Sequence, residues 1–332
     1  MPRPTAVPKS SPRSKSSAAE ELYGVRFTHP DRVVFQDAGI TKRDLADYCA
    51  AVADWMLPQV VHRPLTLVRC PEGMGKPCFY QKQPPQGLPQ SVKRMPIRFK
   101  EGPSVGVYVE DLKGLLALIQ FGVLEIHAWQ ASVDQIERPD RIVFDLDPGA
   151  NVAWSRVVDG ALLLRDSLKE LSLASFVKTT GGKGLHVVVP LEAQRPWSEI
   201  KEFSKAMAQA LVVAEPTRYT LSMSKAARPG KIFIDYLRNE RGATAVAPYS
   251  PRARPGAPIS LPVDWKELRK MHAANTATVG NVLPQLKKRS RDPWKDLPKI
   301  RQTITDGALR AVLSIQPGSI RPARQSAKAA KT

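Results

Sequence analysis

Apolar residues recur at helical spacing in several segments of the chain. After Thr41, the residues Leu45, Tyr48 and Val52 lie three or four positions apart, and the pattern ends at Pro58. Thr41 and Asp44 nearly match a capping box, the pair that satisfies the first free amides of a helix. The same spacing predicts helices over residues 112–121, 157–171, 199–213 and 264–271.

Short apolar runs bounded by turn residues predict strands between these helices. They cover residues 65–70, 105–109, 123–127, 141–147, 176–180, 185–190, 231–236 and 244–247. Because strands and helices are mixed along the chain, the pattern indicates an α/β or α+β fold with an enzyme-like core. The Pro-rich stretch 84–103 is expected to form a long loop or a hairpin excursion, and long ordered loops usually have a function.

The composition indicates a protein with a buried core. Hydrophobic residues make up 42% of the 332 residues, close to the globular norm. No stretch reaches the roughly 18 consecutive apolar residues of a membrane helix, and the N-terminus has no apolar leader. We therefore expect a cytoplasmic protein with no membrane association. We also expect residues 1–20 to be a disordered basic arm, residues 21–295 to form one compact domain, and residues 296–332 to hold a C-terminal helix and basic tail.

The chain is strongly basic. Lys and Arg total 50 against 31 Asp and Glu, which gives a net charge of +19. Residues 1–19 and 316–332 contain basic residues and no acid, yet the remainder still carries +11 of this charge. An excess of this size predicts a polyanionic partner, most simply nucleic acid.

The cysteines give no sign of a metal site. Cys49, Cys70 and Cys78 form no CxxC pair. An odd number of cysteines without ligand spacing is typical of reduced thiols in a cytoplasm. We therefore expect three free thiols and no structural zinc.

Two acids stand at the end of the strand predicted over residues 141–147. Side chains alternate between the faces of a strand, so Ile142, Phe144 and Leu146 point to one face, and Asp145 and Asp147 point to the other. Like charges this close repel one another, and burying them costs several kcal/mol each. A divalent cation removes that cost, and oxygen ligands suit Mg²⁺ or Mn²⁺.

A glycine-rich turn follows in the segment 179–186, which reads TTGGKGLH. Its three glycines let backbone amides approach a ligand closely, and the nearby Lys183 suits a phosphate. His186 lies on the strand after the turn, where its ring can bond phosphate oxygens. The segment is not a Walker A loop, and a tight hairpin with a surface lysine and a core histidine is the structural alternative.

A third acid, Asp235, interrupts an apolar strand at residues 231–236. Together with Asp145 and Asp147 it would complete a site for two metal ions, a common arrangement for phosphoryl transfer. Basic residues, among them Lys225 and Arg228, precede this strand. The first hundred residues add a basic set with two aromatic residues between its members, and this composition suits phosphate contacts and base stacking. The set includes Arg32, Lys42, Arg69, Phe79, Tyr80 and Lys82.

Taken in order, these motifs resemble the polymerase domain of bacterial ATP-dependent DNA ligase D, a member of the archaeo-eukaryotic primase superfamily. The resemblance rests on DLDPG at 145–149, GGKGLH at 181–186, the strand ending in Asp235 and APYSPR at 247–252. It covers about residues 22–290. It implies a primase-like catalytic core with mixed and antiparallel sheets flanked by helices.

The resemblance also implies a function. Members extend DNA 3′ ends with NTPs, preferably, or dNTPs during non-homologous end joining. Asp145, Asp147 and Asp235 match the metal-binding and catalytic acids, with two Mn²⁺ or Mg²⁺ ions. The residues matching the triphosphate site are Thr180, in place of a usual serine, Lys183, His186, Lys225 and Arg228. For DNA binding, Arg32, in place of a usual lysine, and Lys42 match the pocket for a 5′-phosphate, and Phe79 and Tyr80 match an aromatic pair that contacts template bases. Arg252 matches a loop arginine, and the basic Arg69 and Lys82 complete the expected DNA-binding set.

The resemblance stops at the polymerase module. The chain contains no KxDG ligase motif, so we expect it to work beside a separate ATP-dependent ligase and Ku on 5′-phosphorylated ends in the bacterial nucleoid. An excised or naturally split module fits the sequence equally. Three other functions stay open: a replicative or plasmid primase, a non-catalytic DNA-end scaffold, and a phosphatase of the haloacid-dehalogenase type. The last has DxD after an apolar strand but normally continues with Gly-Thr, whereas Pro148 and Gly149 follow here.

Overall fold

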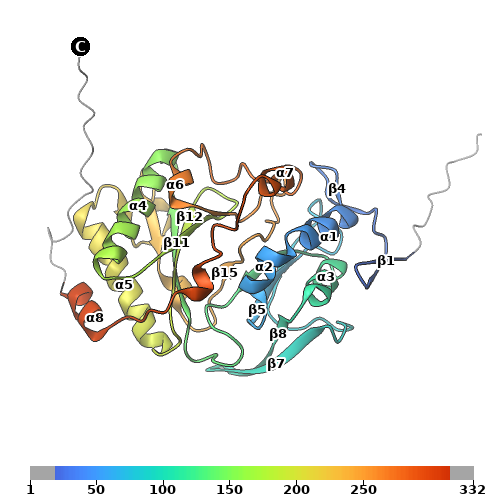
Figure 1. Ribbon diagram of the computed structural model, residues 1–332, viewed down its shortest axis with the longest axis horizontal. Helices are drawn as coiled ribbons and strands as arrows, with labels where there is room; N and C mark the ends of the chain where they lie inside the picture. The colour runs from blue at the N-terminus through green and yellow to red at the C-terminus, as the bar shows by residue number, and fades with distance from the viewer. Residues whose placement is uncertain (1–18, 315–332) are drawn as a thin grey trace, which may run out of the picture.

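The computed structural model describes residues 19–314 of the chain, and Figure 1 shows two sheets flanked by helices. The first, here called the central sheet, has six strands in the order β13, β14, β10, β12, β11, β16. They span Tyr219–Thr220, Ile232–Asp235, Arg141–Pro148, Leu185–Pro190, Phe176–Thr179 and Pro262–Val263, respectively. All neighbours run antiparallel except β13 and β14, which are parallel.

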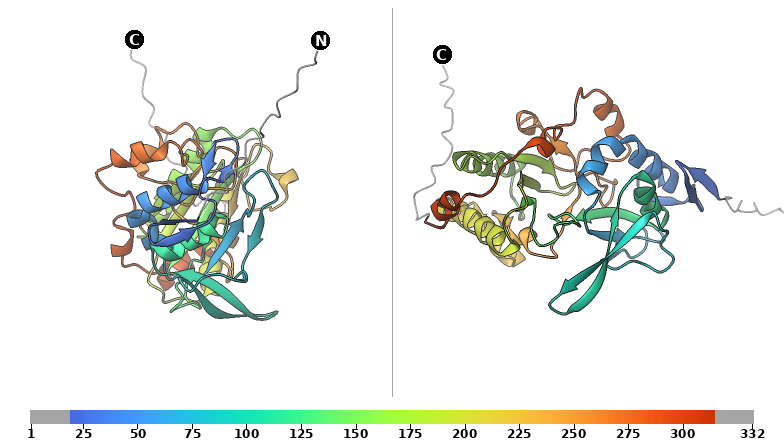
Figure 2. Two further views of the ribbon diagram at one scale, coloured as in Figure 1. Left: turned by 90° about the vertical axis from the view of Figure 1, so that its right-hand side faces the viewer. Right: turned by 60° about the horizontal axis from the view of Figure 1, so that its bottom comes forward.

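The second, here called the N-terminal sheet, has the strand order β15, β9, β5, β8, β7, and β6 pairs with β5 outside this path. These strands span Ala245–Val246, Val123–Ala128, Leu65–Arg69, Gly102–Val109, Val92–Phe99 and Phe79–Gln81, respectively. Figure 2 shows the β7–β8 hairpin projecting from the body of the protein. Two small hairpins precede this sheet: β1 (Glu20–Leu22) with β2 (Val25–Phe27), and β3 (Val33–Phe35) with β4 (Ile40–Thr41).

The helices cover the sheets on their outer sides. The helices α4 (Trp154–Glu170) and α5 (Trp197–Ala214) pack on the central sheet, and α3 (Leu112–Gln120) packs on the N-terminal sheet beside α1 (Lys42–Ala51) and α2 (Ala53–Val60). Three short helices lie in the C-terminal part of the described chain: α6 (Trp265–Leu268), α7 (Val282–Lys287) and α8 (Asp306–Leu313). The helix α8 packs against α5.

Strand β10 lies in the middle of the central sheet because its sequence suits burial on both sides. Ile142, Phe144 and Leu146 are fully buried in the main core, on the face predicted from the alternation. The opposite face begins with the buried Val143 and continues to Asp145 and Asp147 at the strand end. The apolar residues fix the strand in the sheet, and this fixes the two carboxylates at its edge.

The sequence patterns predicted the main elements correctly. Thr41 and Asp44 form the capping box of α1, and the predicted α/β class is confirmed. The helix expected to run from Thr41 toward Pro58 is interrupted at Val52, after which α2 continues through Pro58 to Val60. The stretch 84–103 is a loop followed by β7 and the turn into β8, which agrees with the expected hairpin excursion. The late helix expected over 264–271 is only Trp265–Leu268. No helix in the described part is long and apolar enough to cross a membrane.

The prediction of three reduced cysteines is wrong. Cys70 and Cys78 form a disulfide, and Cys49 remains a free, buried thiol. Cys70 follows β5 and Cys78 precedes β6, and the pairing of these two strands brings the cysteine Cα atoms to 4.4 Å from each other. The spacing of cysteines in the sequence does not show which strands pair, so it could not predict this disulfide.

The boundaries expected for the arm, the compact domain and the tail remain predictions. Residues 1–18 and 315–332 lie outside the described residues, and these include most of the expected arm and about half of the expected C-terminal stretch. Within the stretch 296–332, the structure describes α8.

Candidate functional site

A polar pocket of about 370 Å³ lies between the two sheets. Its floor comes from β10, β12 and the turn before β12, and the facing wall comes from β9, β15 and the loop that holds Arg252 and Arg254. Tyr80, at β6, lies at its edge. Two of the predicted acids, Asp145 and Asp147, and the predicted glycine-rich turn therefore meet in one cavity.

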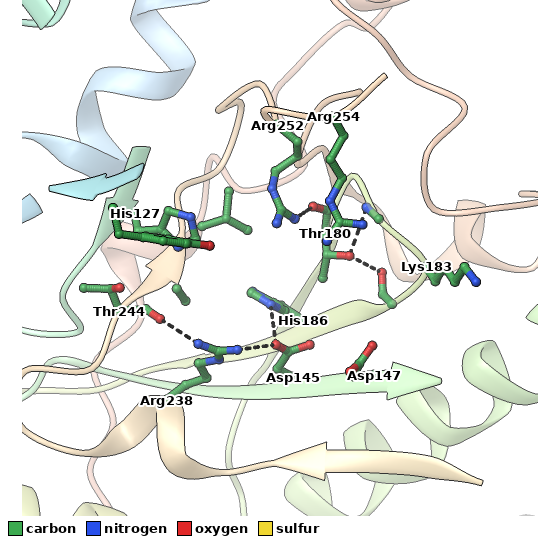
Figure 3. Close-up of a pocket in the computed structure, with 15 residues that line it drawn as sticks. His127, Asp145, Asp147, Thr180, Lys183, His186, Arg238, Thr244, Arg252 and Arg254 are labelled. Carbon is green, nitrogen blue, oxygen red and sulfur yellow. Dashed lines mark hydrogen bonds and ion pairs between the residues drawn. The ribbon is translucent and has the colours of Figure 1, made fainter. Parts of the chain in front are cut away.

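Asp145 occupies the centre of the site. It is the register partner of His186 on β12 and of Asp235 on β14. Its Oδ2 lies 3.4 Å from His186 Nε2 and 3.4 Å from an amino nitrogen of Arg238 (Figure 3). Asp235 is buried beside it, accepts a hydrogen bond from the backbone amide of Leu237 and lies 3.1 Å from Arg238 Nε. One guanidinium thus bridges two carboxylates.

The charges around Asp145 decide which groups are ionised. Burial opposes ionisation of Asp145, but His186, Arg238 and Lys178 more than offset it and lower its pKa. Burial and the nearby Lys178 lower the pKa of His186 to about 4. At neutral pH the imidazole is therefore uncharged. Its Nδ1 is buried and has no hydrogen-bond partner among the described residues, so one nitrogen of the ring is free for a ligand.

Asp147, two residues further along β10, is half-exposed at the pocket rim. Burial and repulsion from Asp145 raise its pKa. Arg228 offsets this with an ion pair of 2.9 Å, and the same guanidinium lies 3.9 Å from the centre of the Phe233 ring. The three acids of the sequence analysis are therefore held by two arginines.

The turn from Thr180 to Gly184 packs tightly against the acids. Thr180 Oγ1 donates to the carbonyl of Gly184 and accepts from the amide of Gly182, which closes the turn. Gly181 has a φ of +65°, a conformation that favours glycine. A Cβ at Gly184 would lie 2.3 Å from the carbonyl oxygen of Leu146. Lys183 is exposed and extends away from Asp145 in Figure 3.

The facing wall contains a buried ionic cluster that the sequence analysis missed. Glu125 on β9 lies 2.5 Å from His127 Nε2 and 2.9 Å from Arg252 Nε. Burial raises the pKa of Glu125, but His127 and Arg252 outweigh it and lower the pKa to about 2. Arg252 also donates to the carbonyl oxygen of Thr180, so it links the cluster to the glycine-rich turn.

The acids suit a divalent cation by their chemistry. Asp145 and Asp147 supply hard oxygen donors at the pocket, and a positive group already bridges Asp145 and Asp235. Within residues 19–314, however, no three His, Cys, Asp or Glu side chains converge as a metal site would require. The three carboxylates instead form ion pairs with two arginines: Arg238 pairs with Asp145 and Asp235, and Arg228 pairs with Asp147.

The residues expected to bind DNA lie mostly outside the pocket. Arg32 is exposed and donates to the carbonyl oxygen of Pro71. Lys42 is buried, and its Nζ donates to the carbonyl oxygen of Thr28. The side chains of Phe79 and Tyr80 are both exposed on β6. Arg69 lies 6.0 Å from the Phe79 ring centre, and Lys82 is exposed just after the strand.

Comparison with known proteins identifies the family. Residues 41–294 match the family described as LigD, primase-polymerase domain. The chain belongs to this family. A multifunctional non-homologous end joining protein LigD of Pseudomonas aeruginosa is 37% identical over 307 residues, which cover 91% of this chain and 36% of that protein. A multifunctional non-homologous end joining DNA repair protein LigD of Mycobacterium tuberculosis is 34% identical over 260 residues, or 76% of this chain and 34% of that protein.

A solved structure agrees with this assignment. The polymerase domain from Mycobacterium tuberculosis ligase D in complex with DNA matches with a TM-score of 0.77 and 31% identity, over 83% of this chain and 98% of that one. The chain spans about a third of the length of the full ligase D relatives. The resemblance and the fold seen in the sequence are thus confirmed. A primase-polymerase domain is a nucleotidyltransferase, and this class of enzyme uses divalent cations. The phosphatase alternative is excluded by this family membership.

The pocket brings together part of the predicted set. The residues it gathers are Asp145, Asp147, Thr180, Lys183, His186, Arg252 and Tyr80. Asp235 lies beside the pocket, and Lys225 is exposed on a single helical turn outside its lining. Arg238, Arg254 and His127 line the pocket but were not among the predicted site residues. In the sequence, these two arginines were marked only by their positions: Arg238 stands three residues after Asp235, and Arg254 stands two residues after Arg252.

Proposed function

We propose that this chain is a DNA-repair polymerase of non-homologous end joining that adds NTPs or dNTPs to DNA 3′ ends at breaks and gaps. The observation that carries the proposal is the position of Asp145, opposite both Asp235 and His186 and facing the Thr180–Gly184 turn. This arrangement sets carboxylates against a turn suited to a triphosphate. Family membership supplies the reaction class.

In the proposed reaction, Asp145, Asp147 and Asp235 would hold two divalent cations, Mn²⁺ or Mg²⁺. Cations bound there would lower the pKa of the primer 3′-hydroxyl and stabilise charge on the pyrophosphate leaving group. Arg238 and Arg228 balance the carboxylate charges. With cations on the carboxylates, these arginines would be available for phosphate oxygens of the substrate. Thr180, Lys183 and His186 hold the triphosphate. Lys225, which lies outside the pocket lining, adds a positive charge toward the same phosphates.

The exposed β6 strand suits DNA in two ways. Phe79 and Tyr80 offer aromatic faces to template bases, with Arg69 and Lys82 close by for phosphates. Arg32 and Lys42 would hold the 5′-phosphate across a gap. The named relatives act in non-homologous end joining, and one polymerase domain is named in complex with DNA. We infer that this chain cooperates with an ATP-dependent ligase and Ku at the bacterial nucleoid.

The decisive test is extension of a labelled 3′ primer on a gapped duplex that has a 5′-phosphorylated downstream strand, with Mn²⁺ or Mg²⁺. We expect templated addition by the wild-type chain. DNA binding without extension would instead support a non-catalytic scaffold. Synthesis on a template that lacks any 3′ end would support a replicative or plasmid primase.

Replacing His186 with Ala is expected to weaken nucleotide use. The buried ring lines the same pocket as the Thr180–Gly184 turn, and its Nδ1 has no hydrogen-bond partner among the described residues. The loss of a hydrogen bond to a charged group costs about 1.5 kcal/mol, or roughly tenfold. We expect this loss as a higher KM for nucleotide or a lower kcat in steady-state kinetics. His272→Ala, at an exposed histidine outside the pocket, serves as the matched control. Unchanged constants in His186→Ala would contradict the triphosphate role.

The preference for 5′-phosphorylated ends is expected to fall as the pH rises through about 8. Burial, with nearby Arg32, lowers the pKa of Lys42 to about 8, so its ammonium is charged below that pH and neutral above it. A 5′-phosphate is almost fully ionised over this range, since its second pKa is about 6. Between pH 7 and 9 the ratio of Kd values for 5′-hydroxyl and 5′-phosphate duplexes should fall several-fold, measured by fluorescence anisotropy.

Two variants control this measurement. Lys42→Arg keeps the charge at every pH tested, so its ratio should stay level, whereas Arg32→Ala should lower the ratio at every pH. A wild-type ratio that does not change with pH would argue against Lys42 as the phosphate ligand. So would an Arg32→Ala, Lys42→Ala double variant that keeps the full preference.

A further inference from the structure

The disulfide between Cys70 and Cys78 closes a loop that no part of the proposed reaction uses. Cys70 is buried at the end of β5, and Cys78 is half-buried immediately before β6. The residues between them are mostly exposed, including Lys76 and Pro77. The loop therefore offers one partly exposed sulfur, that of Cys78, bonded to a buried one, that of Cys70, far in the sequence from the catalytic acids.

The loop contacts the strand that leads from Arg32. The amide of Met74 donates to the carbonyl oxygen of Val34 at 2.8 Å, and the amide of Gly75 donates to Gln36 Oε1 at 2.8 Å. Arg32 donates to the carbonyl oxygen of Pro71 at 3.2 Å. One side of the loop thus holds the segment with the proposed 5′-phosphate ligand.

The other end of the loop leads directly into the aromatic pair. Phe79 and Tyr80 follow Cys78, and the strand that carries them has three residues and pairs with β5. Both rings are exposed, so side-chain packing constrains them little. The cross-link to Cys70 fixes the start of β6 onto the end of β5. It therefore restrains the base-stacking residues and the Arg32 segment at the same time.

We propose that Cys70 and Cys78 are an oxidative modification site: a reversible thiol–disulfide pair that reacts with low-molecular-weight disulfides, and whose oxidised form binds DNA ends more tightly. The proposal rests on the proposed function, because it assigns Arg32, Phe79 and Tyr80 to DNA. The cross-link removes conformations in which β6 or the Arg32 segment lies apart from its bound position, so less ordering remains when DNA binds. The catalytic carboxylates lie on the central sheet, whereas the cross-linked strands β5 and β6 belong to the N-terminal sheet, so we expect the carboxylates to keep their positions in both states.

The chemistry is a pair of thiol–disulfide exchanges. The thiolate of Cys78, the more exposed of the two cysteines, attacks one sulfur of the small disulfide and releases the other as a thiolate. The thiolate of Cys70 then attacks the Cys78 sulfur of the mixed disulfide and releases the second small thiolate. The protein dithiol loses two protons and two electrons, and one small disulfide becomes two small thiols.

The test uses the whole chain in buffers of oxidised and reduced glutathione. The fraction of disulfide is measured by alkylation and mass spectrometry, and the Kd for a gapped, 5′-phosphorylated duplex is measured by fluorescence anisotropy in the same samples. We expect the oxidised form to bind at least threefold more tightly. Cys78→Ser and the Cys70→Ser, Cys78→Ser pair should not respond to the buffer, and Cys49→Ala, at the free cysteine, should respond as the wild type does.

Primer extension at saturating DNA separates this proposal from the proposed function. Equal extension in both redox states, with a Kd that follows the disulfide, supports both. Two outcomes with normal extension overturn the redox proposal alone. In the first, both thiols stay reduced in every buffer; in the second, the Kd for DNA does not change with the fraction of disulfide. A cross-link that forms but resists every thiol buffer also overturns it, because the bond is then only structural. Absence of extension in both states counts against the polymerase assignment.

Discussion

Replacing Asp145 with Asn is expected to reduce primer extension at least about a thousandfold while the fold is retained. Asn keeps the size of the side chain but removes a negative charge at the point where β10, β12 and β14 meet. His186, the partly exposed Arg238 and the buried Lys178 together lower the pKa of Asp145, so its negative charge is part of the site at neutral pH. Extension rates under single-turnover conditions on the gapped duplex measure the loss.

The control for this variant is Asp166→Asn. Asp166 lies on α4, outside the pocket, and its pairing with the neighbouring Arg165 is half-exposed, so we expect activity close to wild type. Circular dichroism and DNA binding test whether the Asp145 variant is folded. A folded Asp145→Asn chain that extends primers within tenfold of the wild-type rate would refute the catalytic assignment of this carboxylate.

The charge balance of the pocket explains how this site can exist without bound substrate. Three carboxylates within two adjacent strands would repel one another, and the raised pKa values of Asp147 and Asp235 reflect burial and that repulsion. Arg238 contacts two of the acids and Arg228 contacts the third. Under the proposed function, bound cations would take the place of these arginine contacts at the carboxylates, and the two arginines would then be available to bind the triphosphate.

The sequence predicted this half of the site because its signals are local. Alternation along β10 indicated which face Asp145 and Asp147 share, and the glycine spacing indicated a turn that only small residues can form. The pairing of Asp145 with Asp235 needed the further assumption that two strands distant in the sequence are neighbours. The ordered motifs supplied that assumption through the family resemblance.

The other half of the site could not be predicted, because it depends on the packing of one sheet against the other. Glu125 and His127 alternate with apolar residues on β9 and look like ordinary strand positions in the sequence. They become a cluster only when the loop with Arg252 folds over them. The short strands β1 to β4 and β6 were also missed, since two or three residues give too little pattern to detect.

Gly184 provides the second large prediction, because it tests the contact between the glycine-rich turn and the acids. Its φ is not in the left-handed region, so Ala can adopt the backbone conformation. The added Cβ would nevertheless lie 2.3 Å from the carbonyl oxygen of Leu146 and 3.2 Å from its carbonyl carbon. Relief of this overlap requires the turn or the end of β10 to move by about 1 Å. Since Leu146 lies between Asp145 and Asp147, the movement separates the acids from Thr180 and Lys183.

We expect Gly184→Ala to lower kcat/KM for nucleotide about a hundredfold, the usual cost of misplacing reacting groups by this distance. The free energy of unfolding should fall by about 1–3 kcal/mol, measured by denaturant titration. Gly280→Ala is the matched control, because its nearest neighbour to an added Cβ is Thr278 Oγ1 at 3.9 Å and its φ is also ordinary. A Gly184→Ala chain with wild-type kinetics would mean that the turn does not need its contact with β10, and the triphosphate would then have to bind elsewhere in the pocket.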